Sequence, residues 1–260
     1  MQSDITLGLL GLGPRWVLRE AAKAEPAEVP LEPTVPASAE AQLPDDLAAT
    51  SPIAPDPASA FVAGRALDAH LGDTLEEVAT LVSACQQCAL HQQRHCAVAG
   101  VGGHAAEWLI VGEAPGAEED AKGEPFVGQA GKLLDAMLAA LGLVRGAGVY
   151  ITNAVKCRPP NNRTPEPDEI DACFPYLRRQ IELIKPRIIV ALGRPAAQAL
   201  LKQEVRIGAA RGKLFRFDAI PVVVTYHPAY LLRNPEEKFK AWEDFCFARE
   251  ALRDQPARAE

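Results

Sequence analysis

Apolar residues in the last two thirds of this chain follow two alternating patterns. Short runs rich in Val, Ile and Leu, typical of buried strands, occupy residues 108–111, 149–152, 187–192 and 221–225. Helical spacing of apolar residues covers the segments around them, at residues 74–84, 129–141, 166–184, 195–201 and 235–252. Near-continuous apolar strands that alternate with helices are typical of a parallel sheet covered on both faces. The pattern predicts an α/β fold with a central four-stranded, mainly parallel sheet, and a hairpin or loop over residues 206–218.

The first sixty residues follow neither pattern. Residues 25–60 are rich in Pro, Ala and acids and contain no aromatic side chain. They therefore cannot bury enough apolar surface to offset the entropy of ordering. We expect a disordered linker there, an apolar peptide over residues 1–24 and a folded domain over residues 61–260. The peptide is interpreted either as a frayed tail or as a docking segment for a protein partner. No basic segment precedes its apolar stretch, so we expect no signal peptide.

Composition narrows the class of protein. Eight acids against one base between residues 20 and 60 account for the whole formal net charge of −7. The rest of the chain is formally neutral, which leaves room for a basic face and does not exclude nucleic-acid binding. The apolar runs fall short of the ~18 residues of a membrane span. Six cysteines without a secretion signal favour metal ligation or free thiols over disulfides, and we expect a cytoplasmic protein that does not contact membranes.

Four of the cysteines have the spacing of metal ligands. Cys85 and Cys88 form a Cys-x-x-Cys pair, and Cys157 and Cys173 follow downstream. Four thiolates suit either a tetrahedral Zn²⁺ ion or an iron–sulfur cluster, and the spacing alone does not separate the two. The two remaining cysteines are interpreted as plain thiols, with Cys96 as a fallback ligand. Since Cys157 comes four residues after Asn153, at the end of a predicted strand, the metal centre is expected beside the working site.

Chemically versatile side chains follow three of the predicted strands. In open parallel sheets the ligand site lies beyond the carboxyl ends of the strands, so these side chains should line one crevice. Phe126 offers a flat face for stacking, Asn153 offers a donor and an acceptor on one amide, and His227 can donate to an oxygen where charge develops. Glu113 places an acid beside them. Each residue taken singly could be structural, but the set suits a site that holds a nucleobase and stabilises it as an anionic leaving group.

Five segments, in this order, resemble the iron–sulfur uracil-DNA glycosylases, often called family 4. They are GEAPG at 112–116, PFVG at 125–128, TNAVKC at 152–157, RPPNNRTP at 158–165 and YHPAYL at 226–231. The resemblance implies a three-layer α/β/α fold and a [4Fe–4S] cluster on Cys85, Cys88, Cys157 and Cys173. It implies a monomeric enzyme that flips uracil out of DNA and hydrolyses the N-glycosidic bond, leaving an abasic site. The rival interpretation is a non-catalytic nucleic-acid-binding module of the same fold, associated with a repair or polymerase complex.

The resemblance also assigns roles by position in these motifs. Asn153 reads the polar edge of the base, Phe126 stacks on its face and His227 stabilises charge on a carbonyl oxygen. Leu231 fills the gap left in the DNA, with Leu232 as its competitor. Glu113 orients the attacking water or helps to hold the base. The base pocket is completed by Gly112, Ala114, Pro115, Gly116 and Glu119, and the candidate phosphate contacts are Arg233, Lys156, Arg158 and Arg163.

Two positions depart from the better-known uracil glycosylases, which carry Asp in place of Ala114 and Tyr in place of Gly116. The carboxylate that positions water and the side chain that blocks the 5-methyl group of thymine are therefore both missing from this motif. Glu119 or Asp120 is the candidate to fill the space beside the ring carbon. Residues 159–165 contain no histidine, so turnover is expected rather than a covalent adduct with DNA.

Overall fold

The computed structural model describes residues 71–255, and within them the chain forms one six-stranded sheet in the order β2-β3-β1-β4-β6-β5. Strands β1, β3, β4 and β6 run parallel and coincide with the four predicted runs, whereas β5 pairs antiparallel with β6. The predicted count of four strands is wrong, because the sheet gains an edge strand on each side. The strands are β1 (Trp108–Gly112), β2 (Val144–Arg145), β3 (Gly148–Asn153), β4 (Ile188–Leu192), β5 (Leu214–Phe217) and β6 (Ile220–Thr225).

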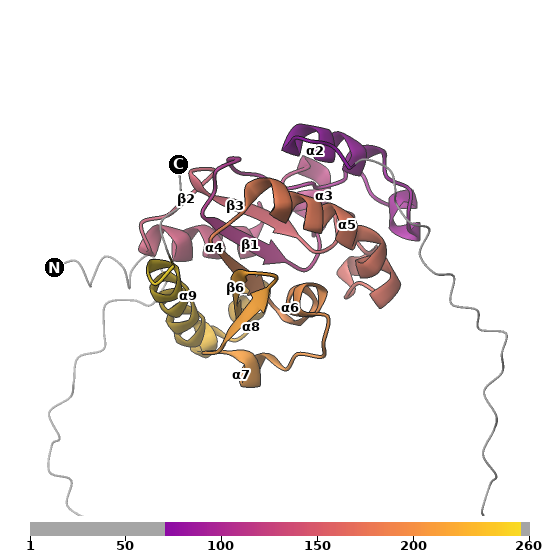
Figure 1. Cartoon of the computed structure of the whole chain (residues 1–260). Coiled ribbons are helices and arrows are strands. Elements are labelled where there is room, and N and C mark those ends of the chain that lie inside the picture. Colours follow the sequence, from indigo (N-terminus) through magenta and orange to yellow (C-terminus); the bar gives the residue numbers. More distant parts are fainter. Residues whose placement is uncertain (1–70, 256–260) are drawn as a thin grey trace, which may run out of the picture. The chain divides into compact units, whose positions relative to one another are not determined.

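Helices cover both faces of this sheet, which confirms the three-layer α/β/α arrangement. Side chains such as Ile110 and Ile151 point from the strands into a core shared with α4, α8 and α9, whereas Leu109 and Ile189 point into a core shared with α5 and α6. Figure 1 shows α5 and α9 on opposite sides of the strands. The helices are α2 (Leu75–Ala84), α3 (Ala117–Lys122), α4 (Gln129–Ala140), α5 (Pro167–Ile184), α6 (Arg194–Leu201), α7 (Ile207–Ala210), α8 (Pro228–Arg233) and α9 (Lys238–Arg253).

The predicted long helices are confirmed to within a few residues. Thr74 caps α2, since its hydroxyl accepts a hydrogen bond from the Glu77 amide at 3.2 Å. The predicted last helix begins three residues later than expected, because Pro235–Glu237 forms a separate 3₁₀ turn. The short helices α3, α7 and α8 were not predicted, since four to six residues give less than two turns of apolar periodicity.

Parts of the predicted domain organisation fall outside the described residues. These are the N-terminal peptide (1–24), the linker (25–60), and residues 61–70 and 256–260 of the predicted domain. Within residues 71–255, none of the helices is both long and apolar enough to cross a lipid bilayer.

The sheet brings the predicted chemistry to one edge. Gly112 and Asn153 end the neighbouring strands β1 and β3 and are paired in register. His227 follows β6 and begins α8 as its N-cap residue. The carboxyl ends of parallel strands meet at the same edge of a sheet, and this edge carries the candidate site.

Candidate active site and cysteine centre

A cavity of about 300 Å³ lies at this edge of the sheet. It brings together three residues that sequence patterns placed in one site, namely Phe126, Asn153 and His227. This volume includes the part of the space that is open to solvent. The remaining lining residues are Ala114, Gly116, Glu119 and Ala130, of which the first three were predicted.

Asn153 presents an unused acceptor to this cavity. Its side chain is 1% exposed, and Oδ1 has no hydrogen-bond partner within the described part of the chain. A buried polar atom without a partner is destabilising and is rare in native proteins, so such an atom points to a ligand. Gly112 provides the room for the amide, because a Cβ at that position would stand 2.3 Å from Asn153 Oδ1 and 2.5 Å from Phe126 Cζ.

His227 is held as a neutral donor. Its Nδ1 accepts a hydrogen bond from the Ala229 amide at 3.1 Å, so the proton of the neutral ring is on Nε2. Burial lowers the pKa of His227 to about 4, the positive charge of Arg233 adds to the effect, and the carboxylate of Glu119 opposes it. At neutral pH the imidazole is therefore uncharged, and its free N–H is available to a ligand.

Phe126 forms one wall of the cavity and is 5% exposed. Its ring centroid lies 5.5 Å from that of His227, with the two planes tilted by 30°. The Phe126 backbone has a φ of 54°, which lies in the left-handed region that phenylalanine seldom adopts. Gly131 lies under this bend, because a Cβ there would stand only 1.8 Å from the Phe126 carbonyl oxygen.

Glu119 lines the cavity, but its carboxylate is occupied by backbone amides. Oε2 accepts from the amide of Gly116 at 3.0 Å, and Oε1 accepts from the amides of Val127 and Gly128 at 3.0 and 3.1 Å. The side chain thus ties the start of α3 to the segment that follows Phe126. Asp120, the alternative candidate beside the ring, instead accepts from the amides of His95 and Cys96 and is absent from the cavity lining.

A wider cavity of about 1360 Å³ adjoins the first one, and Ala114 and His227 line both. Glu113 and Pro115 line this wider space and not the small cavity. Burial raises the pKa of Glu113, opposed by a hydrogen bond from Thr164 and by the charge of Arg194. The other lining residues include Arg163, Arg194 and Arg233, together with Tyr226 and Tyr230, whose rings stack with centroids 5.0 Å apart.

Two of the predicted DNA contacts are buried in the structure. Leu231 lies fully buried in the core on α8, whereas its competitor Leu232 is 42% exposed. Lys156 is 1% exposed, and its ammonium donates to Thr152 Oγ1, the Asn153 carbonyl and Gln180 Oε1. Burial lowers the pKa of Lys156 to about 8. The ammonium of Lys156 is thus engaged by three acceptors within the protein.

Two arginines predicted to contact phosphate differ in the partners that they already bind. Both guanidinium nitrogens of Arg163 donate to the carboxylate of Glu169, at 2.8 and 2.6 Å, so that charge is already paired. Arg158 donates to the side chain of Asn162 on the rim. Arg194 was missed by sequence reasoning, since its position directly after β4 reads as an ordinary helix start.

All four predicted ligand cysteines line a second cavity of about 290 Å³, beside α2 and α5, whereas Cys96 and Cys246 do not. Burial raises the pKa values of Cys88 and Cys157, and raises that of Cys173 to about 12. Two donors face this sulfur set. Arg94 Nη1 donates to Cys157 Sγ at 3.0 Å, and the Lys156 amide donates to Cys173 Sγ at 3.2 Å.

The thiols surround this space rather than converge on one point. Across residues 71–255, no group of three or more His, Cys, Asp or Glu side chains has the arrangement that a single metal ion needs. Four thiols beside one space are a ligand set that suits either a tetrahedral Zn²⁺ ion or an iron–sulfur cluster.

Comparison with known proteins decides the family. Residues 99–248 match the family model of the uracil DNA glycosylase superfamily. The type-4 uracil-DNA glycosylase of Archaeoglobus fulgidus is 45% identical over 181 residues, which cover 66% of this chain and 90% of that protein. This chain belongs to the type-4 uracil-DNA glycosylases. The resemblance drawn from its motifs is therefore confirmed.

A second type-4 relative agrees with this assignment, and a partial match is to a larger protein of another kind. The type-4 uracil-DNA glycosylase of Saccharolobus solfataricus is 49% identical over 193 residues, which cover 71% of this chain and 89% of that protein. A DNA polymerase of Bacillus phage SP01 is 36% identical over 137 residues, which are 53% of this chain but only 15% of the polymerase.

Proposed function

We propose that this type-4 glycosylase chain removes uracil from DNA by flipping the nucleotide into the small cavity and hydrolysing its N-glycosidic bond, leaving an abasic site. The observation that carries this proposal is the unpaired, buried Oδ1 of Asn153 on a residue that lines the same cavity as the neutral N–H donor of His227. An acceptor, a donor and the face of Phe126 around one small cavity match the edge and face of a pyrimidine-dione ring.

Asn153 supplies the base recognition. Its Oδ1 accepts from the ring N–H of uracil, and its amide N–H donates to the neighbouring carbonyl. Cytosine has a lone pair where uracil has that N–H, so it would leave Oδ1 without a donor. A site built around a buried polar partner rejects an analogue that lacks it by about 10⁴-fold or more.

His227 supplies charge stabilisation. As the bond to the sugar breaks, negative charge develops on the carbonyl oxygens of the base, and the Nε2–H of His227 donates to one of them. A preorganised donor of this kind contributes about 10²–10³ in rate. Because Nδ1 already accepts from Ala229, the ring is fixed in the tautomer that this role requires.

Glu113 is proposed to orient the attacking water. Its carboxylate lies in the wider cavity, which meets the small cavity at Ala114 and His227. Water enters from this side because the small cavity is filled by the base. A Glu113→Gln variant that keeps wild-type single-turnover cleavage would remove Glu113 from this role.

The wider cavity is proposed as the path of the DNA strand. Arg194 and Arg233 line it as phosphate contacts, and Leu232, which is exposed whereas Leu231 is buried, takes the wedge role. Phosphate contacts position the strand without reading its sequence, so recognition remains with Asn153.

We infer that Cys85, Cys88, Cys157 and Cys173 hold a [4Fe–4S] cluster, which braces the fold when bound. The sulfur-only ligand set around one cavity supports this. The connection to the base pocket runs through Lys156. Its amide faces Cys173 Sγ, and its ammonium donates to the Asn153 carbonyl at 2.8 Å. One residue thereby contacts both a ligand cysteine, through its backbone amide, and the base-reading residue, through its side chain.

An oligonucleotide assay tests the proposed function. The protein is incubated with labelled strands containing one uracil, hypoxanthine, mismatched thymine or cytosine, and abasic sites are then cleaved by alkali. Uracil-specific scission that is lost in Asn153→Ala supports the proposal. Binding of all strands without scission supports the rival interpretation, a non-catalytic nucleic-acid-binding module.

A further inference from the structure

Phe126 stands in a conformation that its neighbours must maintain. A non-glycine residue with φ near 54° is disfavoured by contacts within its own backbone. Such a residue persists only where the surrounding structure holds it, and these positions gather at functional sites. The strained residue here carries the ring that walls the base pocket.

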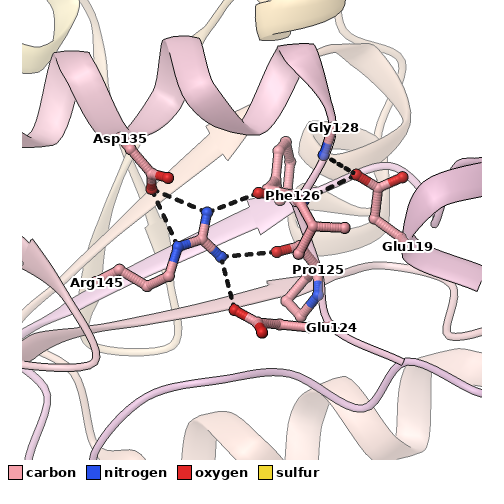
Figure 2. A network of polar contacts seen from close by, with 8 residues as sticks. Glu119, Glu124, Pro125, Phe126, Gly128, Asp135 and Arg145 are labelled. Atoms are coloured by element: carbon pink, nitrogen blue, oxygen red, sulfur yellow. Dashed lines mark hydrogen bonds and ion pairs between the residues drawn. The ribbon is translucent and has the colours of Figure 1, made fainter. Parts of the chain in front are cut away.

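Arg145 holds the two carbonyl groups at this bend. Its Nη1 donates to the Pro125 carbonyl and its Nη2 donates to the Phe126 carbonyl, each at 2.7 Å (Figure 2). The planar guanidinium holds several N–H donors in fixed directions, which suits two adjacent carbonyl oxygens.

The guanidinium is itself fixed in place. Nε and Nη2 donate to Asp135 Oδ1 on α4 at 3.1 and 2.9 Å, and Nη1 lies 3.5 Å from Glu124 Oε1 (Figure 2). The Arg145 side chain is 19% exposed, so solvent competes little for these contacts. The two-residue strand β2 therefore carries an arginine whose guanidinium is held by Asp135 and by Glu124.

The other end of the segment is held by Glu119. Its Oε1 accepts from the amides of Val127 and Gly128, directly after Phe126. Arg145 thus binds the carbonyls before the bend while Glu119 binds the amides after it. Glu119 lines the small cavity, whereas Arg145 is not among the lining residues of either cavity and reaches the small one only through the Phe126 carbonyl.

We propose that Arg145 is a positioning residue of the glycosylase: it maintains the left-handed backbone of Phe126 and thereby keeps the ring at stacking position over the flipped base. This rests on the proposed function, since the ring matters only if a base enters the cavity. Arg145 acts through Phe126 and touches neither the base nor the DNA.

The test compares Arg145→Met with the wild type in three measurements. We expect the single-turnover rate on uracil-containing strands to fall about tenfold, equivalent to about 1.4 kcal/mol. The dissociation constant for abasic DNA should stay within about twofold, because the proposed phosphate contacts are elsewhere. In a crystal structure of the variant, Phe126 should leave the left-handed region and its ring should move from His227.

Two further variants guard against a folding failure. Arg145→Lys keeps the charge but replaces the fixed fork of the guanidinium with donors on a single nitrogen, so it should show most of the rate loss. Asp135→Asn, at an exposed position, should show a smaller loss in the same direction because it weakens the anchor of the guanidinium.

A double-mutant cycle separates positioning from general stability. In a Phe126→Ala background, adding Arg145→Met should cost no further rate, although it should still lower the unfolding temperature. The matched control is Arg187→Met. Arg187 is equally buried, at 19% exposed, and donates to the Leu252 and Gln255 carbonyls far from the site. Its loss should reduce stability and leave the rate of folded enzyme unchanged.

Distinct results overturn the two proposals. A wild-type protein that releases no uracil overturns the proposed function, and the position of Phe126 in the variant crystal then still decides the role of Arg145. Wild-type cleavage with an unchanged rate in Arg145→Met overturns the positioning role. An equal rate loss from Arg145→Met with and without the Phe126 ring also overturns it.

Discussion

The substitution Gly112→Ala adds one methyl group between the two side chains that are proposed to grip the base. The new Cβ would stand 2.3 Å from Asn153 Oδ1 and 2.5 Å from Phe126 Cζ. Ordinary contacts between such atoms are about 3.5 Å or longer, so both side chains must retreat by roughly 1 Å. Gly112 does not have a positive φ, so backbone strain does not contribute to the effect.

The displacement sets the expected magnitude. A misplacement of about 1 Å in a catalytic constellation can lower the rate about 10²-fold, equivalent to about 2.7 kcal/mol of barrier. Overpacking of a close-packed site lowers the free energy of unfolding by about 1–3 kcal/mol. We therefore expect a folded, less stable protein whose cleavage step is about a hundredfold slower.

Single-turnover quench kinetics on a labelled strand with one uracil measure the cleavage step directly, and thermal unfolding measures stability. Gly103→Ala is the matched control, because its Cβ would meet nothing nearer than 3.6 Å, and it should behave as the wild type. A folded Gly112→Ala protein that cleaves at the wild-type rate would refute the reasoning, since the positions of Asn153 and Phe126 would then be irrelevant.

Three further predictions concern His227, the wedge and the cysteine centre. Because the pKa of His227 is lowered to about 4, the NMR signals of its ring should be those of a neutral imidazole from pH 8 to about 5, and a titration centred near 6.5 would contradict the neutral donor. Below about pH 6.5, His227 takes up a proton in the unfolded state but stays neutral in the native state. The free energy of unfolding should therefore drop by up to about 3 kcal/mol as the pH falls toward 4, and urea titrations at several pH values measure this. Leu232→Ala should slow uracil cleavage in duplex DNA several-fold with an unchanged unfolding temperature, whereas Leu231→Ala should lower the free energy of unfolding by about 2–5 kcal/mol; the reverse pattern would restore Leu231 as the wedge. Cys157→Ala should give poorly soluble protein without visible absorbance, and a soluble, colourless and fully active variant would sink the bracing role of the centre.

The sequence predicted the parts of the fold that depend on continuous apolar runs. The strands that end at Gly112 and Asn153 are buried on both faces, so their composition marks them without ambiguity. The three residues of the base pocket were found because the ends of parallel strands converge. The strand topology brings these residues together, and the motifs identify the residue types at the strand ends.

Residues whose role depends on tertiary placement were not predictable in this way. Leu231 and Leu232 are neighbours on a six-residue helix, and only the packing of α8 decides which one is buried. The i+3 spacing of Leu231 from the buried Pro228 was the available signal. The sequence predicts Lys156 to be a surface charge, because no local pattern indicates the three hydrogen-bond acceptors that its buried ammonium contacts in the fold.

Arg145 was missed for a related reason. It lies in a strand of two residues, which carries no pattern of alternation. Its partners Pro125 and Phe126 lie about twenty residues away in the sequence and accept through their backbone carbonyls. Because every residue has a backbone carbonyl, the amino-acid types at these positions do not indicate the contact.

The most direct test of the central claim is a crystal structure with DNA that carries a cleavage-resistant 2′-fluoro-deoxyuridine. The account predicts uracil inside the small cavity, with its ring N–H donating to Asn153 Oδ1, a carbonyl oxygen accepting from His227 Nε2, and its face on Phe126. Uracil bound outside this cavity, or with its N–H turned away from Asn153, would contradict the account.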